Sequence, residues 1–222
     1  MYRKESYVFR EGKPVLAIVR TYGKKDFQDL IAIQQESFPP PFPSDLWWNE
    51  EQLDNHVEHY PEGALCVEIN GELAGSITGL LVEFNQEKPL HTWEKITDDG
   101  YIRNHDPKGK TLYIVDICVK PAFRKLDLGK LLMQSMYERV VHDGLDRLLG
   151  GGRMPGYHQY GSQLTPAQYV ENVVKGELRD PVISFLLKCG RMPVSVVPNY
   201  LEDEESHHNA LLMEWKNPFY ER

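Results

Sequence analysis

Apolar residues recur along the first quarter of the chain in patterns typical of a strand followed by two helices. The β-branched run VLAIVRTY (15–22) predicts a strand, and apolar residues at helical spacing predict a helix over 27–38. The proline-rich segment PPPFP ends that helix, because successive prolines cannot continue it. Ser44 is the expected N-cap of a second amphipathic helix over 45–60.

The middle of the chain contains a clear hairpin pattern. Two β-rich runs within 64–84 are separated by Asn70-Gly71, a pair that tolerates the positive φ angles of a two-residue turn. Residues 85–110 are polar and rich in turn formers, with one short helix expected around Trp93. We interpret them as an insertion near a functional edge.

The second half begins with a mostly apolar strand, TLYIVDICV (111–119), followed by a basic loop and a helix over 129–142. A strand near LDRLLGG and a glycine- and tyrosine-rich loop come next. Four further elements are expected, namely helices over 165–175 and 180–190 and strands at MPVSVV and NALLMEW. This mixed order predicts an α/β (α+β) fold.

Length and composition fit a single domain over 1–222, with insertions near 85–110 and 150–178. No apolar run approaches the roughly 20 residues that a membrane helix needs, so we expect no membrane partner. The polar N-terminal segment MYRKESYVFREGK has no apolar core of a secretory signal and is interpreted as a frayed end.

The net charge and the cysteine content indicate which ligands, metal sites and cell compartment to expect. The net charge of −8 disfavours nucleic acid as a partner and weakly favours cationic ligands such as amines. The three scattered cysteines do not form a disulfide framework or a CxxC metal site. We therefore expect reduced thiols, a cytoplasmic location and no metal.

The loop after the strand at 111–119 carries the candidate chemistry. A strand, a short loop and a helix direct backbone N–H groups and the positive end of the helix dipole at one point, where phosphates bind. Arg124, Lys125 and Lys130 add positive charge there. On spacing alone, a solvated basic turn is the more common explanation.

The residues around this loop favour the phosphate site. The segment ICVKPAFRKLDLGKLL resembles the acyl-CoA signature of the GCN5-related N-acetyltransferase (GNAT) family, in which Arg-x-x-Gly-x-Gly/Ala opens a helix. Arg124 and Gly129 match that signature, and the order of elements over 15–216 is similar to the family's. GGRMPGY and NYLEDEES also resemble the acetyltransferase-like domain joined to a carbon–nitrogen hydrolase in some bacterial proteins.

The resemblance implies a GNAT fold, with a central mixed, mostly antiparallel sheet of about seven strands flanked by helices. The fourth and fifth strands would splay apart, and acetyl-CoA would lie in the opening as the acyl donor. An amine acceptor would attack the thioester directly, without a metal. A homodimer is left open.

The resemblance also implies which residues bind the donor. Backbone N–H groups near the end of the strand would polarise the thioester carbonyl, and the loop amides would hold the pyrophosphate. The expected donor-binding residues are Ile117, Cys118, Val119, Arg124, Lys125, Leu126, Asp127, Leu128, Gly129 and Lys130. Cys118 is expected to be a buried small residue rather than a nucleophile.

Two positions depart from the family pattern. Asp127 replaces the middle glycine of the loop, and we expect its carboxylate to cap the helix at 129–142 and compete with the ligand. Leu186 stands where many relatives have a tyrosine that acts as general acid. These departures favour the alternative of a non-catalytic acyl-CoA-binding module of the same fold.

Other residues could supply the proton transfers. Tyr157 and Tyr160, with His158 between them, are candidates for the acid, and packing aromatics are an equal alternative. Candidates for the base are Tyr113, whose unperturbed pKa near 10 makes it a poor base, Asp116 and Glu83. Asp116 could equally be a structural carboxylate.

Overall fold

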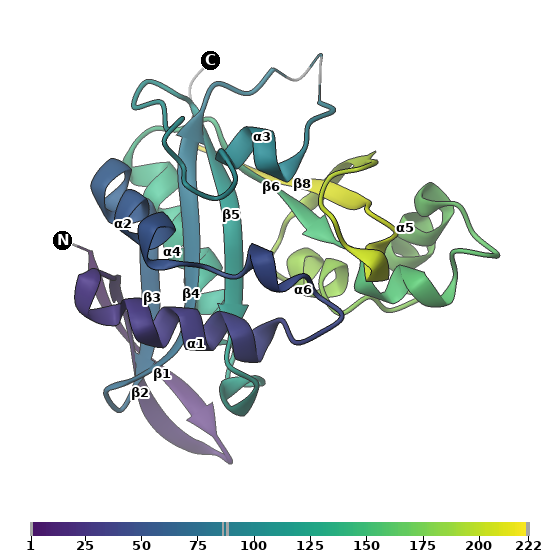
Figure 1. The fold of residues 1–222 in the computed structure, drawn as a ribbon. Helices are drawn as coiled ribbons and strands as arrows, with labels where there is room; N and C mark the ends of the chain where they lie inside the picture. Colours follow the sequence, from purple (N-terminus) through teal and green to yellow (C-terminus); the bar gives the residue numbers. More distant parts are fainter. Residues whose placement is uncertain (1, 86, 88, 221–222) are drawn as a thin grey trace.

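The computed structural model describes residues 2–85, 87 and 89–220, in which eight strands form one sheet. The strand order is β1-β2-β3-β4-β5-β6-β8-β7, and every pair is antiparallel except β5 with β6 (Figure 1). The strands are β1 (Arg3–Arg10), β2 (Lys13–Thr21), β3 (Ala64–Ile69), β4 (Glu72–Val82), β5 (Thr111–Val119), β6 (Arg147–Arg153), β7 (Met192–Val197) and β8 (Ala210–Lys216). The expected mixed, mostly antiparallel sheet is confirmed.

Helices cover both faces of the sheet. Helices α1 and α2 lie in front of the central strands in Figure 1, α4 lies behind them, and α5 and α6 lie beside β6 and β8. The α-helices are α1 (Phe27–Ser37), α2 (Glu50–His59), α3 (Trp93–Thr97), α4 (Leu128–His142), α5 (Pro166–Lys175) and α6 (Ile183–Lys188). The short helix expected around Trp93 is α3.

The hairpin of β3 and β4 forms as the sequence predicts. Asn70 and Gly71 connect the strands with φ angles of 52° and 83°, so both adopt the left-handed conformation of a type I′ turn. The pairing of Ile69 with Glu72 follows directly from this two-residue turn. Both strands are buried over nearly their whole length.

The N-terminal segment was wrongly expected to be a frayed end. It forms β1, which pairs with β2 in eight consecutive register positions through a turn at Glu11-Gly12. Its side chains are mostly exposed, and Tyr7 and Phe9 are 70% and 65% exposed. Backbone hydrogen bonds rather than burial therefore define β1, and the sheet has eight strands instead of about seven.

The start of the second helix also differs from the prediction. Ser44 begins a single 3₁₀ turn (Ser44–Leu46), after which the chain is extended at Trp47. Helix α2 begins only at Glu50, where the Asn49 side chain accepts a hydrogen bond from the Gln52 amide (2.9 Å). Trp47 meanwhile donates its indole N–H to the Phe38 carbonyl (3.0 Å), which holds the linker against the end of α1.

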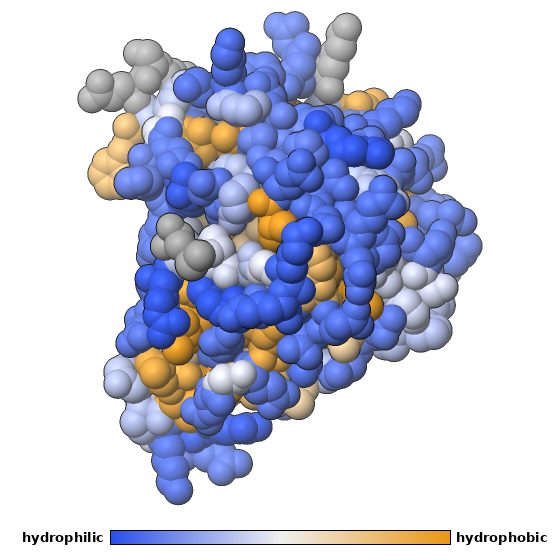
Figure 2. All heavy atoms as spheres, turned by 60° about the vertical axis from the view of Figure 1, so that its left-hand side comes forward, coloured by the Kyte–Doolittle hydropathy of each residue, from blue (hydrophilic) through white to orange (hydrophobic). Residues whose placement is uncertain are grey.

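One face of the molecule carries mainly polar side chains (Figure 2). Figure 2 shows a mostly hydrophilic face with smaller hydrophobic areas between the charged groups. Among the helices of the described residues, none has the length and apolar character needed to cross a bilayer.

Candidate functional site

The central feature of the site is the separation of β5 and β6. Their parallel pairing covers only Thr111–Tyr113 with Arg147–Leu149, whereas both strands continue beyond it. A cavity of about 760 Å³ lies where they diverge, between these strands, the end of α1 and the start of α4. The expected splay of the two strands is confirmed.

Glycines on β6 allow other elements to approach the splayed strand. A Cβ atom at Gly151 would lie 2.4 Å from Cζ of Tyr200, and one at Gly152 would lie 2.7 Å from Cδ1 of Leu186. Real Cβ atoms do not approach other atoms so closely, so a larger residue at either position would have to displace these side chains. The cavity wall on this side is therefore built from backbone together with the Tyr200 and Leu186 side chains.

The basic loop opens one end of the cavity. A short 3₁₀ turn, Pro121–Phe123, follows β5, and α4 begins at Leu128. The first N–H groups of an α-helix have no acceptor within the helix, and Leu128, Gly129 and Lys130 line the cavity. A Cβ atom at Gly129 would lie 3.0 Å from the Phe185 ring, so glycine lets the backbone approach closely. This is a cradle suited to a phosphate.

Nine of the ten predicted donor-binding residues line this cavity. They are Ile117, Cys118, Val119, Arg124, Lys125, Asp127, Leu128, Gly129 and Lys130. Leu126 is instead buried and is not a lining residue. Burial raises the pKa of the Cys118 thiol well above its usual value, so a thiolate is disfavoured at this position.

The expectation that Asp127 caps α4 with its carboxylate is wrong. Asp127 precedes the first residue of the helix, but its φ is 56° and its side chain makes no capping hydrogen bond. A capping residue normally has extended backbone angles, which bring its side-chain oxygen to the free amides. The left-handed conformation removes that geometry, so the carboxylate does not occupy the N–H groups of the cradle.

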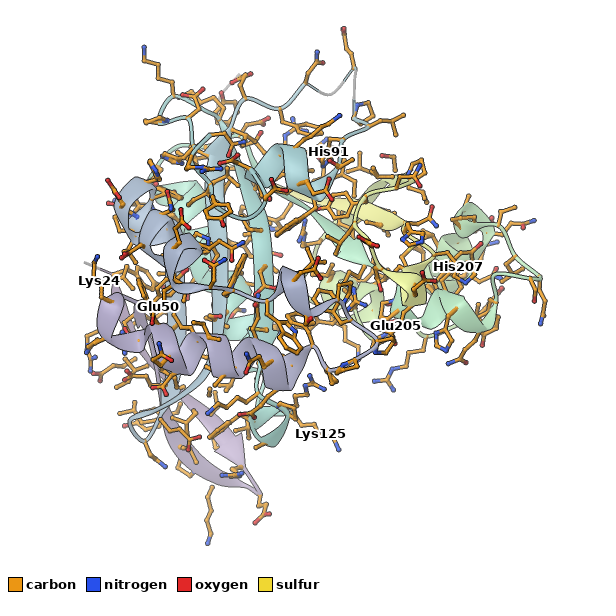
Figure 3. The ribbon with its side chains drawn as sticks, viewed as in Figure 1. Lys24, Glu50, His91, Lys125, Glu205 and His207 are labelled. Atoms are coloured by element: carbon orange, nitrogen blue, oxygen red, sulfur yellow. The ribbon has the colours of Figure 1, made fainter. Side chains whose placement is uncertain are left out.

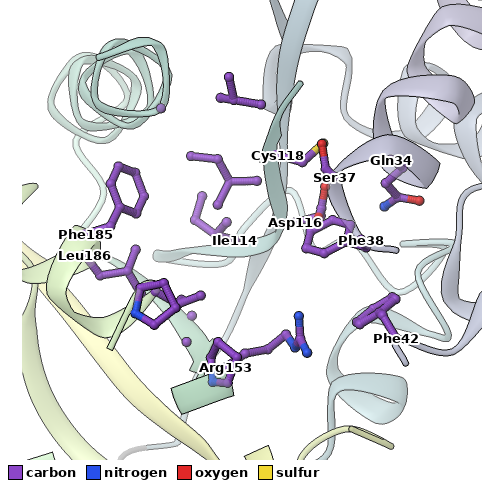
Figure 4. A pocket seen from close by; sticks show the side chains of 18 of the residues that line it. Gln34, Ser37, Phe38, Phe42, Ile114, Asp116, Cys118, Arg153, Phe185 and Leu186 are labelled. Carbon is purple, nitrogen blue, oxygen red and sulfur yellow. The ribbon is translucent and has the colours of Figure 1, made fainter. Parts of the chain in front are cut away.

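Asp116 is the acidic side chain in the part of the cavity wall that β5 forms. Figure 4 shows it close to Ser37 and Phe38, near Cys118 and with Gln34 on the same side of β5. Its Oδ2 atom is buried and has no hydrogen-bond partner among the described residues. Burial raises the pKa of Asp116 to about 6, although the neighbouring Gln34 partly opposes this effect. A carboxylate with such a pKa can exchange protons near neutral pH.

The other predicted acid–base residues lie elsewhere. Tyr157 is buried and donates its hydroxyl to the Leu164 carbonyl (2.8 Å), and its ring packs near Tyr169. Tyr160 also packs near Tyr169, and His158 is exposed. None of these three residues, nor Glu83, is among those that line the cavity. The contacts of Tyr157 and Tyr160 are therefore those of packing aromatics, which was the alternative to a role as general acid.

Tyr113 is fully buried behind the cavity wall. Its hydroxyl lies 2.8 Å from Nε2 of His91 and 2.7 Å from the hydroxyl of Tyr200. Burial, reinforced by Tyr200, raises the pKa of Tyr113 well above 10, so it is not a base by itself. Tyr200 lines the cavity, whereas Tyr113 does not.

An ion-pair cluster that sequence reasoning missed forms the far wall. Arg153, at the end of β6, donates to both carboxylate oxygens of Asp203 (2.8 and 2.7 Å) and to Glu205 (3.0 Å). Its guanidinium also lies 4.7 Å from the centre of the Phe42 ring, toward which it points in Figure 4. Although burial opposes its charge, Asp203 raises the pKa of Arg153. Arg153 belongs to the segment GGRMPGY, and Asp203 and Glu205 belong to NYLEDEES. These two segments were therefore the sequence signal from which the ion-pair cluster could have been predicted.

No group of three or more His, Cys, Asp or Glu side chains in the described part of the chain has metal-binding geometry. His56 is fully buried, with Nε2 2.6 Å from the Gly100 carbonyl and Nδ1 3.0 Å from the Tyr22 hydroxyl. His207 packs against the Tyr157 ring, and Figure 3 shows it on the α5 side of the molecule.

Comparison with known families agrees with this geometry. The model of the acetyltransferase (GNAT) family matches residues 27–153, which include α1, the splayed strands and the basic loop. The chain belongs to the GNAT family. The resemblance found in the signature loop is thereby confirmed.

Two curated relatives extend the match beyond the core. The chain is 52% identical over 219 residues to the uncharacterized N-acetyltransferase YkwB of Bacillus subtilis, covering 99% of this chain and 97% of that protein. It is 39% identical over 204 residues to the probable hydrolase YhcX of the same organism. This second match covers 91% of the chain but only 39% of YhcX, in agreement with the resemblance to a domain joined to a hydrolase.

Two solved structures share the fold over 90% of this chain and 98% of their own. One is the loading GNATL domain of CurA from Lyngbya majuscula, with a TM-score of 0.78 and 19% identity. The other is the GNAT-like decarboxylase GphF in complex with isobutyryl-CoA, with a TM-score of 0.74 and 21% identity. At these identities the likeness concerns the fold.

Proposed function

We propose that this protein is an N-acetyltransferase that moves the acetyl group of acetyl-CoA to a primary amine of a small molecule or peptide. The observation that carries the proposal is Asp116, whose buried, unpartnered carboxylate oxygen lies in the wall of the cavity between the splayed strands. A carboxylate there can attract an ammonium group and take one of its protons. The three cysteines are buried and free, which is consistent with a reducing, cytoplasmic environment.

The entrance of the cavity supports acetyl-CoA as the donor. The free amides at the start of α4 and the side chains of Arg124, Lys125 and Lys130 offer an anion site for the pyrophosphate. The pantetheine would then extend between β5 and β6 toward the amides of Ile117 to Val119. Those amides would polarise the thioester carbonyl, which gains negative charge when the amine attacks.

The decisive experiment measures thiol release from acetyl-CoA over a panel of primary amines, with CoA binding measured in parallel. We expect turnover whose kcat/KM rises with pH through about 6, because Asp116 must be ionised to act as a base. Asp116→Asn should lower kcat by about a hundredfold or more. Asp29→Asn, an exposed position on α1, is the matched control and should leave kcat unchanged.

The outcomes separate the alternatives. CoA binding without turnover on any amine would favour a non-catalytic acyl-CoA-binding module. Absence of CoA binding would contradict both functions. Turnover that Asp116→Asn leaves intact would keep the acetyltransferase and remove Asp116 as its base.

A second candidate function is decarboxylation of an acyl-CoA whose acyl group carries a carboxylate. Arg191 favours it, because this cavity-lining side chain is 2% exposed and its Nε atom has no hydrogen-bond partner among the described residues. Its Nη2 atom donates to the carbonyls of Gly150 and Met213 rather than to a carboxylate. A buried, uncompensated guanidinium is a suitable partner for an anionic acyl group.

Malonyl-CoA is the probe for this second reaction. Incubation without amine should convert it to acetyl-CoA and carbon dioxide, which mass spectrometry of the CoA products detects. Unchanged malonyl-CoA, together with amine-dependent turnover of acetyl-CoA, would exclude decarboxylation of this probe and leave the acetyltransferase.

A further inference from the structure

Three side chains outside the family signature form a hydrogen-bonded chain that begins at the cavity. Tyr200 lines the cavity, and its hydroxyl is 2.7 Å from that of Tyr113, which is 2.8 Å from Nε2 of His91. The three residues come from the segment between β7 and β8, from β5 and from the insertion before α3. His91 is only partly buried and lies near α3, at the opposite end of the molecule from Lys125 (Figure 3).

The hydrogen bonds that link Tyr200, Tyr113 and His91 have a fixed donor–acceptor direction. Nδ1 of His91 lies 2.6 Å from the carbonyl of Pro89, and a carbonyl only accepts hydrogen bonds. Nδ1 therefore carries the proton of the neutral ring, and Nε2 must accept from the Tyr113 hydroxyl. The Tyr113 oxygen in turn accepts from Tyr200. Both tyrosine hydroxyls thus donate in the direction that leads from the cavity to His91.

Other groups surround the two tyrosine hydroxyls, and the backbone of Gly151 interacts with both. Tyr113 and Tyr200 are 0% and 3% exposed, so water does not replace their mutual hydrogen bond. Trp93 donates its backbone N–H to the Tyr200 carbonyl (2.7 Å), which anchors the loop carrying Tyr200 to α3. Against the effect of burial, the positive charge of Arg191 lowers the pKa of both tyrosines and so favours transient negative charge on their oxygens.

The proposed reaction with an ammonium acceptor releases one net proton per turnover, which Asp116 alone cannot carry out of the cavity. An ammonium acceptor loses one proton before it attacks and a second from the nitrogen once the N–C bond has formed. One carboxylate can hold only one proton at a time. The departing thiolate takes up the proton held by Asp116, so the second proton of the amine must leave a cavity whose walls are largely apolar.

We propose that Tyr200, Tyr113 and His91 form a proton relay that exports the second proton of the acceptor amine. This inference rests on the acetyltransferase function proposed above. As the N–C bond forms and the C–S bond breaks, the C–S electron pair stays on the departing thiolate, which takes up the proton held by Asp116. The nitrogen passes its proton to the Tyr200 oxygen, the Tyr200 proton moves to Tyr113, and the Tyr113 proton moves to Nε2 of His91. The imidazolium then releases a proton to water.

The properties of His91 fit the outer end of such a relay. Burial lowers the pKa of His91 below its usual value, so the ring is neutral and ready to accept a proton at neutral pH. The same low basicity lets the imidazolium release the proton quickly. The relay also assigns a role to Tyr113 that does not require it to be a base by itself.

The relay is tested with Tyr113→Phe and Tyr200→Phe, which remove single hydroxyls and keep the rings. Both should lower kcat about tenfold to a hundredfold with little change in KM for acetyl-CoA. Tyr137→Phe is the matched control, because its partly buried hydroxyl donates to the Cys189 carbonyl (2.9 Å) outside the relay. His91→Ala should lose a similar factor and recover with added imidazole, whereas imidazole should not rescue Tyr113→Phe. Equal effects of Tyr137→Phe and Tyr113→Phe would overturn the relay.

A second measurement does not depend on turnover. Nitrogen NMR of the side chain of His91 should report the tautomer with the proton on Nδ1, and Tyr113→Phe should shift the Nε2 resonance. A proton on Nε2 in the neutral protein would reverse the direction of the chain and contradict the proposal. Thiol release by the unaltered protein tests the proposed function separately, so the two failures are distinguishable.

Discussion

At the scale of single residues, Asp127 lies at the phosphate cradle because an aspartate tolerates the left-handed backbone of the loop. Its φ of 56° and its uncapped side chain leave the first amides of α4 available. The residue is exposed, so its charge is screened by water. The carboxylate therefore weakens anion binding only modestly and does not block the cradle.

Replacement of this residue tests that view. Asp127→Gly should tighten CoA binding by about threefold, the effect of removing one charge about 6 Å from a phosphate at a dielectric of about 80. The free energy of unfolding should change by less than about 1 kcal/mol, because relief of the left-handed strain offsets the flexibility of glycine. Calorimetric titration and urea unfolding measure the two effects. A loss above about 1 kcal/mol without CoA would indicate a capping carboxylate.

Site residues can be predicted from the sequence when their arrangement depends only on residues nearby in the chain. The loop residues from Arg124 to Lys130 belong to one strand, loop and helix, so their convergence follows from local structure. The Arg153 ion pair with Asp203 and the contact of Tyr113 with Tyr200 join positions 50 and 87 residues apart. Those pairings require the register of β6 with β8, which no local pattern defines.

At the scale of elements, α2 is held to the insertion through a buried histidine. His56 bridges the Gly100 carbonyl and the Tyr22 hydroxyl, which itself lies 2.8 Å from Oγ1 of Thr78 on β4. Burial lowers the pKa of His56 to about 4, so the ring is neutral in the folded protein. This link positions α3 and the segment that carries the rest of the insertion.

The same histidine makes stability depend on pH. In the unfolded chain His56 titrates near 6.5, so the unfolded state binds more protons as the pH falls from about 6.5 to about 4. Between pH 7 and pH 5 the free energy of unfolding should decrease by about 2 kcal/mol from this group. His56→Gln should reduce that dependence, and His59→Gln, an exposed position on α2, should not. Urea unfolding at the two pH values measures both slopes.

Elements with a buried face were predicted well, and those without one were not. The β3–β4 hairpin has continuous burial and an Asn-Gly turn, so pattern and turn chemistry agree. Strand β1 has only Val8 buried among eight residues, so hydrophobic alternation gives no signal for it. The Glu11-Gly12 turn was the available evidence for β1.

At the scale of the whole molecule, CoA should stabilise the fold through the basic loop. At a concentration of about 100 times Kd, binding adds about 2.7 kcal/mol, which raises the melting temperature by about 5 to 10 °C for a chain of this size. The shift should shrink when salt rises from 0.1 to 1 M, because the screening length falls from about 10 to about 3 Å.

Matched lysine variants localise this effect. Lys125→Gln should reduce the CoA-dependent shift, because Lys125 lines the cavity, whereas Lys24→Gln, on the surface near α1, should not (Figure 3). Thermal unfolding with and without CoA measures both. A shift of the same size in all three proteins would indicate that CoA binds away from the loop.

The short pairing of β5 with β6 divides the sheet into two groups of strands, β1 to β5 and β6 to β8. Only three register positions and the surrounding packing join them, so the boundary offers few backbone hydrogen bonds to break. Amides near this boundary should exchange with solvent deuterium through openings that cost less than complete unfolding. A ligand bound in the gap would slow that exchange on both sides. The substrate would therefore also couple the two groups of strands, and the coupling would be lost when the product leaves.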